Sequence, residues 1–200
     1  MTELLSVAAG YLLGSMPFGY WLPRLFRGED IRASGSGNVG ATNVFRVYGR
    51  RLGAAVVLLD VGKGFTAALL GLWAGGALVG VLAGAAAMLG HARPVFLRFQ
   101  KGGKMVATAG GATFALAPLA AACCVAVWIA VFLLTRYASV ASIATALALV
   151  LLVWLFGSPW PVVVFAIAGT AAIVFLHRHN VRRLAAGTEH RFELHRPRRA

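Results

Sequence analysis

Seven long apolar stretches constrain the fold of this chain more than any other feature of its sequence. They occupy residues 4–23, 53–72, 76–97, 104–118, 119–135, 138–157 and 160–177. An apolar helix needs about 17–25 residues to cross a bilayer, and it satisfies its backbone hydrogen bonds internally, as lipid requires. The fourth and fifth stretches are separated only by Pro118. The lengths alone therefore leave six or seven crossings open.

The charged fraction supports a membrane protein over a soluble one. Only 12% of the 200 residues are charged, whereas soluble domains carry about 25%. The length suits one helical bundle. We therefore expect a single all-α, polytopic integral-membrane domain over residues 1–200.

The basic residues decide between six and seven crossings. All of the 19 Lys and Arg residues except Lys63 lie in four polar segments: 24–52, 91–104, Arg136 and the tail from 178. Seven crossings place all four segments on one side, whereas one helix over 104–135 would separate Arg136 from the tail. Because cytoplasmic loops carry the excess of Lys and Arg, we predict seven transmembrane helices, with the N-terminus outside and the C-terminus in the cytoplasm. The same bias accounts for the net charge of +13, so that charge does not indicate nucleic-acid binding.

Small and polar residues gather in the first of these segments, in "SGSGNVGATNVFR" at 34–46. Three glycines allow backbone N–H groups to point together at an anion: Gly35, Gly37 and Gly40. Five side chains add neutral hydrogen-bonding groups: Ser34, Ser36, Asn38, Thr42 and Asn43. Arg46 adds a planar guanidinium suited to phosphate. The pattern indicates a phosphate-binding loop, and the alternative is an ordinary solvated loop built from the same residue types.

A second polar cluster lies in "FQKGGKMVATAGG", residues 99–111. Lys101 and Lys104 flank the pair Gly102–Gly103 just where an apolar stretch begins. A helix N-terminus with free N–H groups and neighbouring ammonium groups favours an anion. The alternative is that both lysines only set the topology. The spacing of a Walker A loop is absent.

The third cluster is "HRHNVRRLAAGTEHR", residues 177–191. His177 and Asn180 share a face if the last helix continues, because they are three residues apart. Glu189 is placed to hold a nearby arginine. The other histidines, His179, His190 and His195, lack a metal-binding spacing, so we predict no metal site.

Two charges, Asp60 and Lys63, interrupt the second apolar stretch. Charges inside a bilayer are costly and are usually paired or functional. A spacing of three residues lets them neutralise one another on a helix. The sequence leaves open whether they form a structural pair or support the first polar loop.

Six stretches together resemble a known family. They are "GSMPFGYWLPRLF" at 14–26, "SGSGNVGATNVFR" at 34–46, "LLDVGKG" at 58–64, "GHARPVF" at 90–96, "KGGKMVAT" at 101–108 and "HRHNVRRLAAGTE" at 177–189. In this order, over nearly the whole chain, the sequence is similar to the bacterial acyl-phosphate:glycerol-3-phosphate acyltransferases, the PlsY family. The seven-helix topology expected above agrees with that family.

The resemblance implies an enzyme and its setting. An acyl group would pass from acyl phosphate to the 1-hydroxyl of glycerol 3-phosphate, giving lysophosphatidic acid and phosphate in phospholipid synthesis. The enzyme would lie among the lipids of the bacterial cytoplasmic (inner) membrane, with its active site facing the cytoplasm, and would use no cofactor, metal or nucleic acid. The His-x4-Asp signature of other acyltransferases is absent after both His91 and His177.

Matching motif to motif, the resemblance implies roles for individual residues. The implied catalytic residues are Ser36, Arg46, Lys104, His177 and Asn180. The implied substrate-binding residues are Gly37, Asn38, Gly40, Thr42, Asn43, Lys101, Gly102, Gly103, Thr188 and Glu189, the last as a structural carboxylate. A substrate phosphate oxygen would take the proton of the acceptor hydroxyl, while His177 orients groups or assists.

The second motif departs from the family pattern Phe-Lys-Gly-Gly-Lys-Gly. Gln100 is an extra residue, and Met105 stands where the family has glycine. The sequence leaves open whether Met105 crowds the acceptor phosphate and changes the affinity for the acceptor or its identity.

Three other functions remain open from the sequence. A transporter of a phosphorylated solute would place polar groups near the bilayer midplane and show repeat symmetry. A divergent paralogue would use another acceptor, and a structural or regulatory membrane protein would have a decayed site.

Overall fold

The computed structural model describes residues 1–192, and every regular element among them is helical, which confirms the all-α prediction. The α-helices are α1 (Thr2–Ser15), α2 (Phe18–Arg27), α3 (Ala41–Tyr48), α4 (Arg50–Ala92), α5 (Val106–Leu116), α6 (Pro118–Thr135), α7 (Ala138–Leu155), α8 (Trp160–Leu176) and α9 (Arg178–Ala185). Two short 3-10 turns, η1 (Ile31–Ala33) and η2 (Val95–Leu97), lie in the connections.

Within the described residues, 3 helical stretches are long and apolar enough to cross a membrane. They are Arg50–Leu97, Pro118–Thr135 and Ala138–Leu155. The bent pair α8 and α9, with 53° between its two helices, brings the number to 4 if it counts as one crossing, and α5 is a shorter apolar helix.

The first apolar stretch is interrupted, so the prediction of one helix over 4–23 is wrong. α1 ends at Ser15, and Met16 takes an extended conformation before Pro17. A proline disfavours helical geometry in the residue before it and has no backbone N–H to donate. The chain therefore starts a new helix, α2, in a new direction.

α4 is a helical hairpin whose turn is made by two glycines. Gly75 and Gly76 leave helical geometry, and Gly76 has φ 73°, a conformation that favours glycine. The two arms approach closely, because a Cβ on Gly71 would lie 2.5 Å from the carbonyl oxygen of Val79. The turn separates the predicted stretches 53–72 and 76–97 where the sequence placed their boundary.

Close backbone contacts at glycine hold α1 and α5 against α4. A Cβ on Gly14 would lie 2.0 Å from the carbonyl oxygen of Ala87, and one on Gly64 would lie 2.0 Å from that of Thr108. Small residues let helices approach to van der Waals contact, which is the main source of association in lipid. Larger side chains at either position would push these helices apart.

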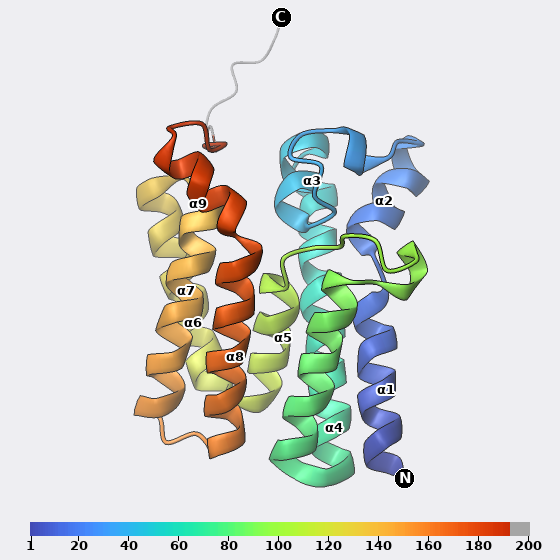
Figure 1. The fold of residues 1–200 in the computed structure, drawn as a ribbon, viewed down its shortest axis with the longest axis vertical. Coiled ribbons are helices and arrows are strands. Elements are labelled where there is room, and N and C mark those ends of the chain that lie inside the picture. The colour runs from blue at the N-terminus through green and yellow to red at the C-terminus, as the bar shows by residue number, and fades with distance from the viewer. Residues whose placement is uncertain (193–200) are drawn as a thin grey trace, which may run out of the picture.

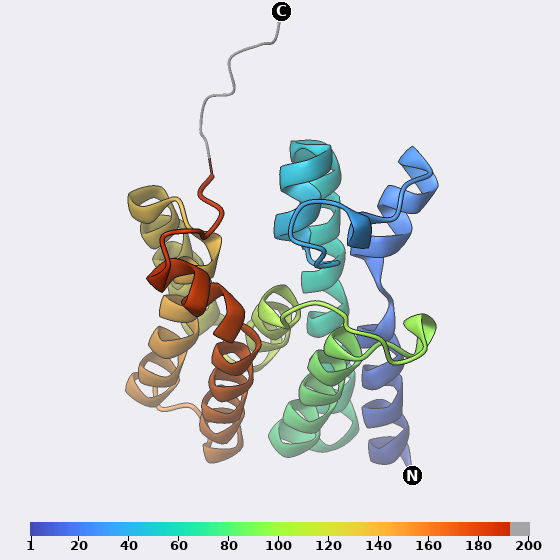
Figure 2. The same ribbon diagram turned by 45° about the horizontal axis from the view of Figure 1, so that its top comes forward.

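The helices form two groups with α5 between them (Figures 1 and 2). One group contains α1 to α4, and the other contains α6 to α9. The short helices α2, α3 and α9 all lie at the same end of the molecule. The first and third polar segments found in the sequence therefore lie near this end, and the second, in the connection before α5, lies between the two groups farther along the helices.

Candidate functional site

The first polar loop is shaped by the side chain of Asn43. Its Oδ1 accepts a hydrogen bond from the Ser36 backbone N–H at 2.9 Å, and its Nδ2 donates to the carbonyls of Ser34 and Asn38, both at 3.0 Å. Asn43 is only 2% exposed. Both amide donors are engaged within the loop, so the geometry of Asn43 is that of a residue holding the loop in shape.

Two glycines in the loop adopt left-handed geometry, Gly35 with φ 60° and Gly37 with φ 69°. Asn38 closes the next turn, because its Oδ1 accepts the Gly40 N–H at 2.7 Å. α3 then begins at Ala41 and carries Arg46 one turn further on.

The second polar segment is held by main-chain contacts to the end of α4. The N–H groups of Gly102 and Gly103 donate to the carbonyls of Ala92 and His91, at 2.9 and 3.0 Å. A Cβ on Gly103 would lie 2.0 Å from Nε2 of the His91 ring. Both glycines are therefore required by packing, and they fix where Lys104 leaves the turn.

Lys104 is half-buried and points at Asn180, whose Oδ1 accepts from its Nζ at 2.5 Å. Burial is the main reason that the pKa of Lys104 falls from its ordinary value to about 8. The carboxylate of Glu189 opposes that effect, and Arg183, Lys101 and Arg46 add to it. Lys104 lies in the connection before α5, where a partly desolvated cation binds an anion more strongly than in water.

Met105 does not lie on the wall of the cavity that these segments enclose. It is 5% exposed and packs into the apolar cluster that includes Met88 and Ala109. Its φ of 69° explains why a glycine suits this position. The geometry gives no support to crowding of the acceptor phosphate by Met105, which the sequence had left open.

The extra residue Gln100 ties the second segment to the first. Its Oε1 accepts a hydrogen bond from Arg32 at 2.8 Å, and Arg32 also pairs with Asp30 at 2.6 Å. Arg98 and Phe99, just before it, both have positive φ. The added length is therefore taken up in the connection and not in the turn that presents Lys104.

The third segment bends where α8 ends. The 53° angle between α8 and α9 falls at His177, which caps the end of α8 and the start of α9, so the last helix does not continue straight; His177 and Asn180 nevertheless both line the cavity described below. His177 Nδ1 lies 2.8 Å from the carbonyl oxygen of Ile173. Because a carbonyl can only accept, Nδ1 donates in this contact, and Nε2 of a neutral ring keeps its lone pair.

Glu189 organises the side chains around Asn180. Its Oε1 accepts from Asn180 Nδ2 at 2.7 Å and from Ser139 Oγ at 3.0 Å, and its Oε2 accepts from Arg183 Nε at 2.7 Å. Burial works against the carboxylate, but these hydrogen bonds outweigh it and lower the pKa of Glu189. The expectation that Glu189 holds an arginine is confirmed, and the arginine is Arg183.

A buried ionic group lies beside the second segment. Lys63 Nζ lies 2.8 Å from Asp60 Oδ1 and donates to the carbonyl of Met16 at 2.9 Å. His91 Nδ1 lies 3.5 Å from the same carboxylate oxygen. Of the two alternatives left open by the sequence, the geometry favours the structural pair of Asp60 and Lys63, which contacts the α1–α2 break through Met16 and the end of α4 through His91.

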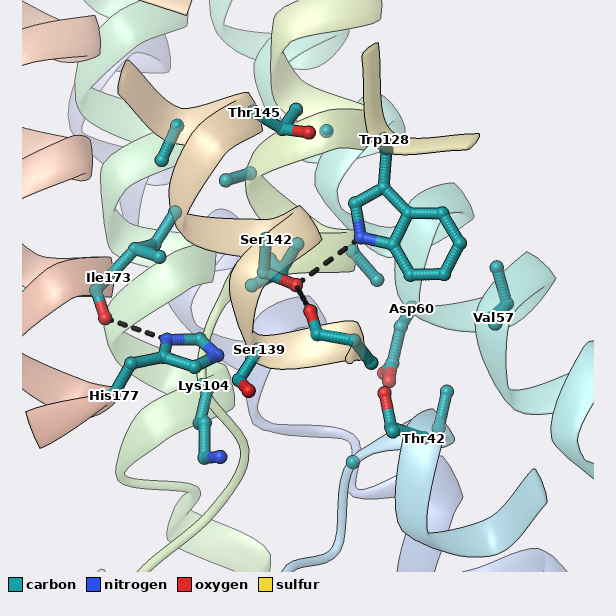
Figure 3. A pocket seen from close by; sticks show the side chains of 18 of the residues that line it. Thr42, Val57, Asp60, Lys104, Trp128, Ser139, Ser142, Thr145, Ile173 and His177 are labelled. Atoms are coloured by element: carbon teal, nitrogen blue, oxygen red, sulfur yellow. Dashed lines mark hydrogen bonds between the residues drawn. The ribbon is translucent and has the colours of Figure 1, made fainter. Parts of the chain in front are cut away.

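A cavity of about 370 Å³ opens where the three segments meet. The predicted site residues on its wall are Ser36, Asn38, Gly40, Thr42, Asn43, Arg46, Lys104, His177, Asn180 and Glu189. Figure 3 shows His177, Lys104 and Ser139 on one side of it, with Thr42 and Asp60 across from them. Five predicted residues are not on the wall: Gly37, Lys101, Gly102, Gly103 and Thr188.

Beyond the polar groups the cavity becomes apolar. Its wall there includes Phe114 from α5, Val125 from α6 and Leu149 from α7. One cavity thus offers cations and hydrogen-bond donors at one end and a hydrocarbon-like surface at the other. A molecule with an anionic head and an apolar tail matches this arrangement.

Sequence reasoning missed Ser139, Ser142 and Trp128, which also line the cavity. Trp128 Nε1 donates to Ser142 Oγ at 3.3 Å, and Ser142 donates to the carbonyl of Ala138 at 2.7 Å (Figure 3). The available signal was a row of polar residues three apart, Ser139, Ser142 and Thr145, on one face of an otherwise apolar helix.

No group of three or more His, Cys, Asp or Glu side chains placed to hold a metal ion occurs within residues 1–192. His195 and the last arginines lie outside the described residues.

Comparisons with known proteins agree with one another. The family model described as glycerol-3-phosphate acyltransferase matches residues 4–187. A glycerol-3-phosphate acyltransferase of Desulforudis audaxviator is 46% identical over 192 residues, covering 96% of each chain. A glycerol-3-phosphate acyltransferase of Aquifex aeolicus is 45% identical, and the alignment covers 96% of this chain and 100% of the relative.

Two solved structures share this fold. A crystal structure of PlsY, an integral membrane glycerol 3-phosphate acyltransferase, in its glycerol 3-phosphate form superposes with a TM-score of 0.93 at 44% identity. The lysophosphatidic acid form superposes with a TM-score of 0.90 at 42% identity. Each alignment covers 96% of both chains.

Proposed function

The chain belongs to the glycerol-3-phosphate acyltransferase family, and we propose that the cavity between its two helix groups is where an acyl group passes from acyl phosphate to glycerol 3-phosphate. The observation that carries this proposal is the convergence of Arg46, Lys104 and His177 on one cavity whose far end is apolar. The products are lysophosphatidic acid and phosphate.

The two phosphates are assigned to opposite sides of the cavity. Arg46 and Ser36 face the phosphate of the acyl donor, whose chain lies along the apolar wall. Lys104 and Asn180, linked by a hydrogen bond, face the phosphate of glycerol 3-phosphate. Glu189 accepts from both Ser139 and Asn180, and so holds Asn180, and with it Lys104, in place.

The chemical step needs orientation and charge stabilisation more than a covalent intermediate. Acyl phosphate is already activated, with phosphate as its leaving group. The 1-hydroxyl oxygen forms a bond to the acyl carbon, the bond from that carbon to the phosphate oxygen breaks, and the hydroxyl proton passes to a substrate phosphate oxygen. His177, with Nδ1 donating to Ile173, offers the Nε2 lone pair to orient that hydroxyl.

The polar end of the cavity is assigned to the cytoplasmic headgroup level of the bacterial inner membrane. We propose that the chain is one integral-membrane domain over residues 1–200 that crosses seven times, with the two arms of α4 counted separately and the N-terminus outside. All four basic segments then lie on the cytoplasmic side. A transporter would hold its polar groups near the midplane and show repeat symmetry, whereas here the first and third polar segments lie with α3 and α9 at one end of the molecule.

A direct assay tests the function. Purified protein in lipid nanodiscs, given acyl phosphate and glycerol 3-phosphate, should release phosphate and form lysophosphatidic acid in equal amounts. Glycerol and dihydroxyacetone phosphate serve as alternative acceptors. Absence of product with every acceptor, under conditions in which the Aquifex relative is active, contradicts the enzyme assignment. Turnover of only an alternative acceptor would instead identify a divergent paralogue.

The pKa of Lys104 predicts an alkaline limit to activity. An ammonium is charged below its pKa, so the anion-binding form predominates below about pH 8 and declines above it. We expect kcat/KM for glycerol 3-phosphate, which reports the free enzyme, to fall about tenfold per pH unit well above that value. The Glu189→Gln variant, which loses the negative charge that raises the pKa of Lys104, should begin this fall at lower pH. A profile that is flat to pH 10 contradicts the role of Lys104.

A further inference from the structure

Phe192 joins the two helix groups at the cavity. Its ring packs edge-to-face on Phe45 of α3, with ring centres 6.2 Å apart, and on Phe132 of α6, with centres 5.3 Å apart. Its backbone N–H donates to the carbonyl of Arg136 at 2.9 Å. Figure 1 places α3 and α6 in different groups. The segment that ends at Phe192 therefore crosses from one group to the other.

The same ring contacts the guanidinium of Arg46, whose central carbon lies 4.9 Å from the ring centre. Within residues 1–192, Arg46 makes no hydrogen bond and no ion pair through its side chain. An aromatic ring attracts the face of a guanidinium, whereas the N–H donors lie in the guanidinium plane. The ring therefore holds Arg46 without occupying its donors.

Two other arginines, Arg32 and Arg183, are engaged by carboxylates. Arg32 donates to Asp30 and Gln100, and Arg183 donates to Glu189. In both, a carboxylate compensates the charge and occupies donors that a phosphate would need. Arg46 keeps both its charge and its donors available on the cavity wall.

We propose that Phe192 is a positioning residue for acyl transfer, whose ring fixes the plane of the Arg46 guanidinium so that its free N–H donors meet the phosphate of the acyl donor. This inference rests on the proposed function. It predicts that Phe192 affects the binding of acyl phosphate and not that of glycerol 3-phosphate.

The segment that ends at Phe192 is also held at Glu189. This second attachment allows a positioning role of Phe192 to be distinguished from a purely structural one. Glu189, three residues earlier, is held by Asn180, Ser139 and Arg183. If Phe192 only kept this segment folded, its loss would also loosen Asn180 and Lys104. The binding of glycerol 3-phosphate would then weaken together with the binding of acyl phosphate.

Two variants at Phe192 distinguish the effect of the aromatic ring from the effect of an apolar side chain of similar size. Phe192→Leu keeps an apolar side chain but removes the aromatic face, and Phe192→Tyr keeps that face. Phe175→Leu is the matched control, because Arg178 lies 4.2 Å from the Phe175 ring centre and neither residue lies on the cavity wall. All are assayed in nanodiscs, with KM measured separately for each substrate and thermal unfolding measured alongside.

We expect Phe192→Leu to raise KM for acyl phosphate by about five- to thirtyfold, the range that a partly desolvated cation–π contact predicts. KM for glycerol 3-phosphate should stay close to wild type. Phe192→Tyr and Phe175→Leu should match the wild type for both substrates.

Three results would overturn the inference. They are an unchanged KM for acyl phosphate in Phe192→Leu, an equal rise of KM for both substrates, and a failure of Phe192→Tyr to preserve the wild-type value. An inactive wild-type protein would contradict the proposed function itself, and therefore also this role of Phe192. An active wild type with an unaffected Phe192→Leu variant contradicts the positioning role alone.

Discussion

Replacing Arg46 with alanine is expected to lower kcat/KM by about 10²–10³-fold, the cost typical of removing one preorganised donor from a charged transition state. Arg46 is the cation that faces the leaving phosphate in the proposed arrangement, and it lies half-buried on the cavity wall. Arg183 also lines the cavity, but its Nε donates to Glu189, so it is already engaged by a carboxylate. Phosphate release and lysophosphatidic acid formation, followed at saturating glycerol 3-phosphate, measure the loss.

Two further variants make the Arg46 experiment specific. Arg46→Lys keeps the charge but loses the planar fork of donors, so it should recover only part of the activity. Arg50→Ala removes an exposed arginine at the start of α4 that does not line the cavity, and it should behave as wild type. Full activity in Arg46→Ala would show that the donor phosphate lies elsewhere.

Replacing Lys63 alone with methionine is expected to destabilise the protein by about 3–5 kcal/mol, because it leaves the buried carboxylate of Asp60 without its ion-pair partner. The Lys63→Met change also removes the hydrogen bond to the carbonyl of Met16, at the break between α1 and α2. Chemical or thermal unfolding in detergent, followed by circular dichroism, measures the difference.

A double replacement tests whether the charge imbalance is the cause. Asp60→Leu combined with Lys63→Met removes both charges, so most of the lost stability should return. If the double variant is as unstable as Lys63→Met, packing around these residues, and not their pairing, determines stability. Activity of the double variant is a separate question, because Asp60 also lines the cavity.

The sequence predicted the helical segments well because lipid leaves few alternatives to apolar helices. Its one clear error came at residues 4–23, where a run of apolar residues hides a break. Pro17 carries the signal for that break, but average hydropathy does not respond to it. The turn at Gly75–Gly76 was found because it fell between two stretches of sufficient length.

The site was less predictable where a role depends on the direction of a side chain. The sequence names Asn43 as a hydrogen-bonding residue, but it does not reveal that the amide turns inward to the loop. It names Met105 as a departure from glycine, but it gives neither the positive φ nor the packing of the side chain away from the cavity.

Phe192 gave no signal at all, because an isolated aromatic residue in a basic segment has no periodicity that marks it. Its importance depends on contacts with Phe45 of α3 and Phe132 of α6, which lie 147 and 60 positions earlier in the sequence. Such long-range contacts become visible only in three dimensions.

The short helix α5 bears on how the two substrates reach the site and on the units in which their concentrations are expressed. Its 11 residues rise roughly 16 Å, about half of a bilayer's hydrocarbon thickness. In the proposed seven-crossing arrangement α5 therefore covers only part of the bilayer, and the turn before it presents Lys104 to the cavity. Glycerol 3-phosphate reaches it as a solute measured per volume of water, whereas the acyl donor reaches it by lateral diffusion and is measured per area of leaflet. In the proposed reaction, the enzyme thus joins a three-dimensional supply to a two-dimensional one.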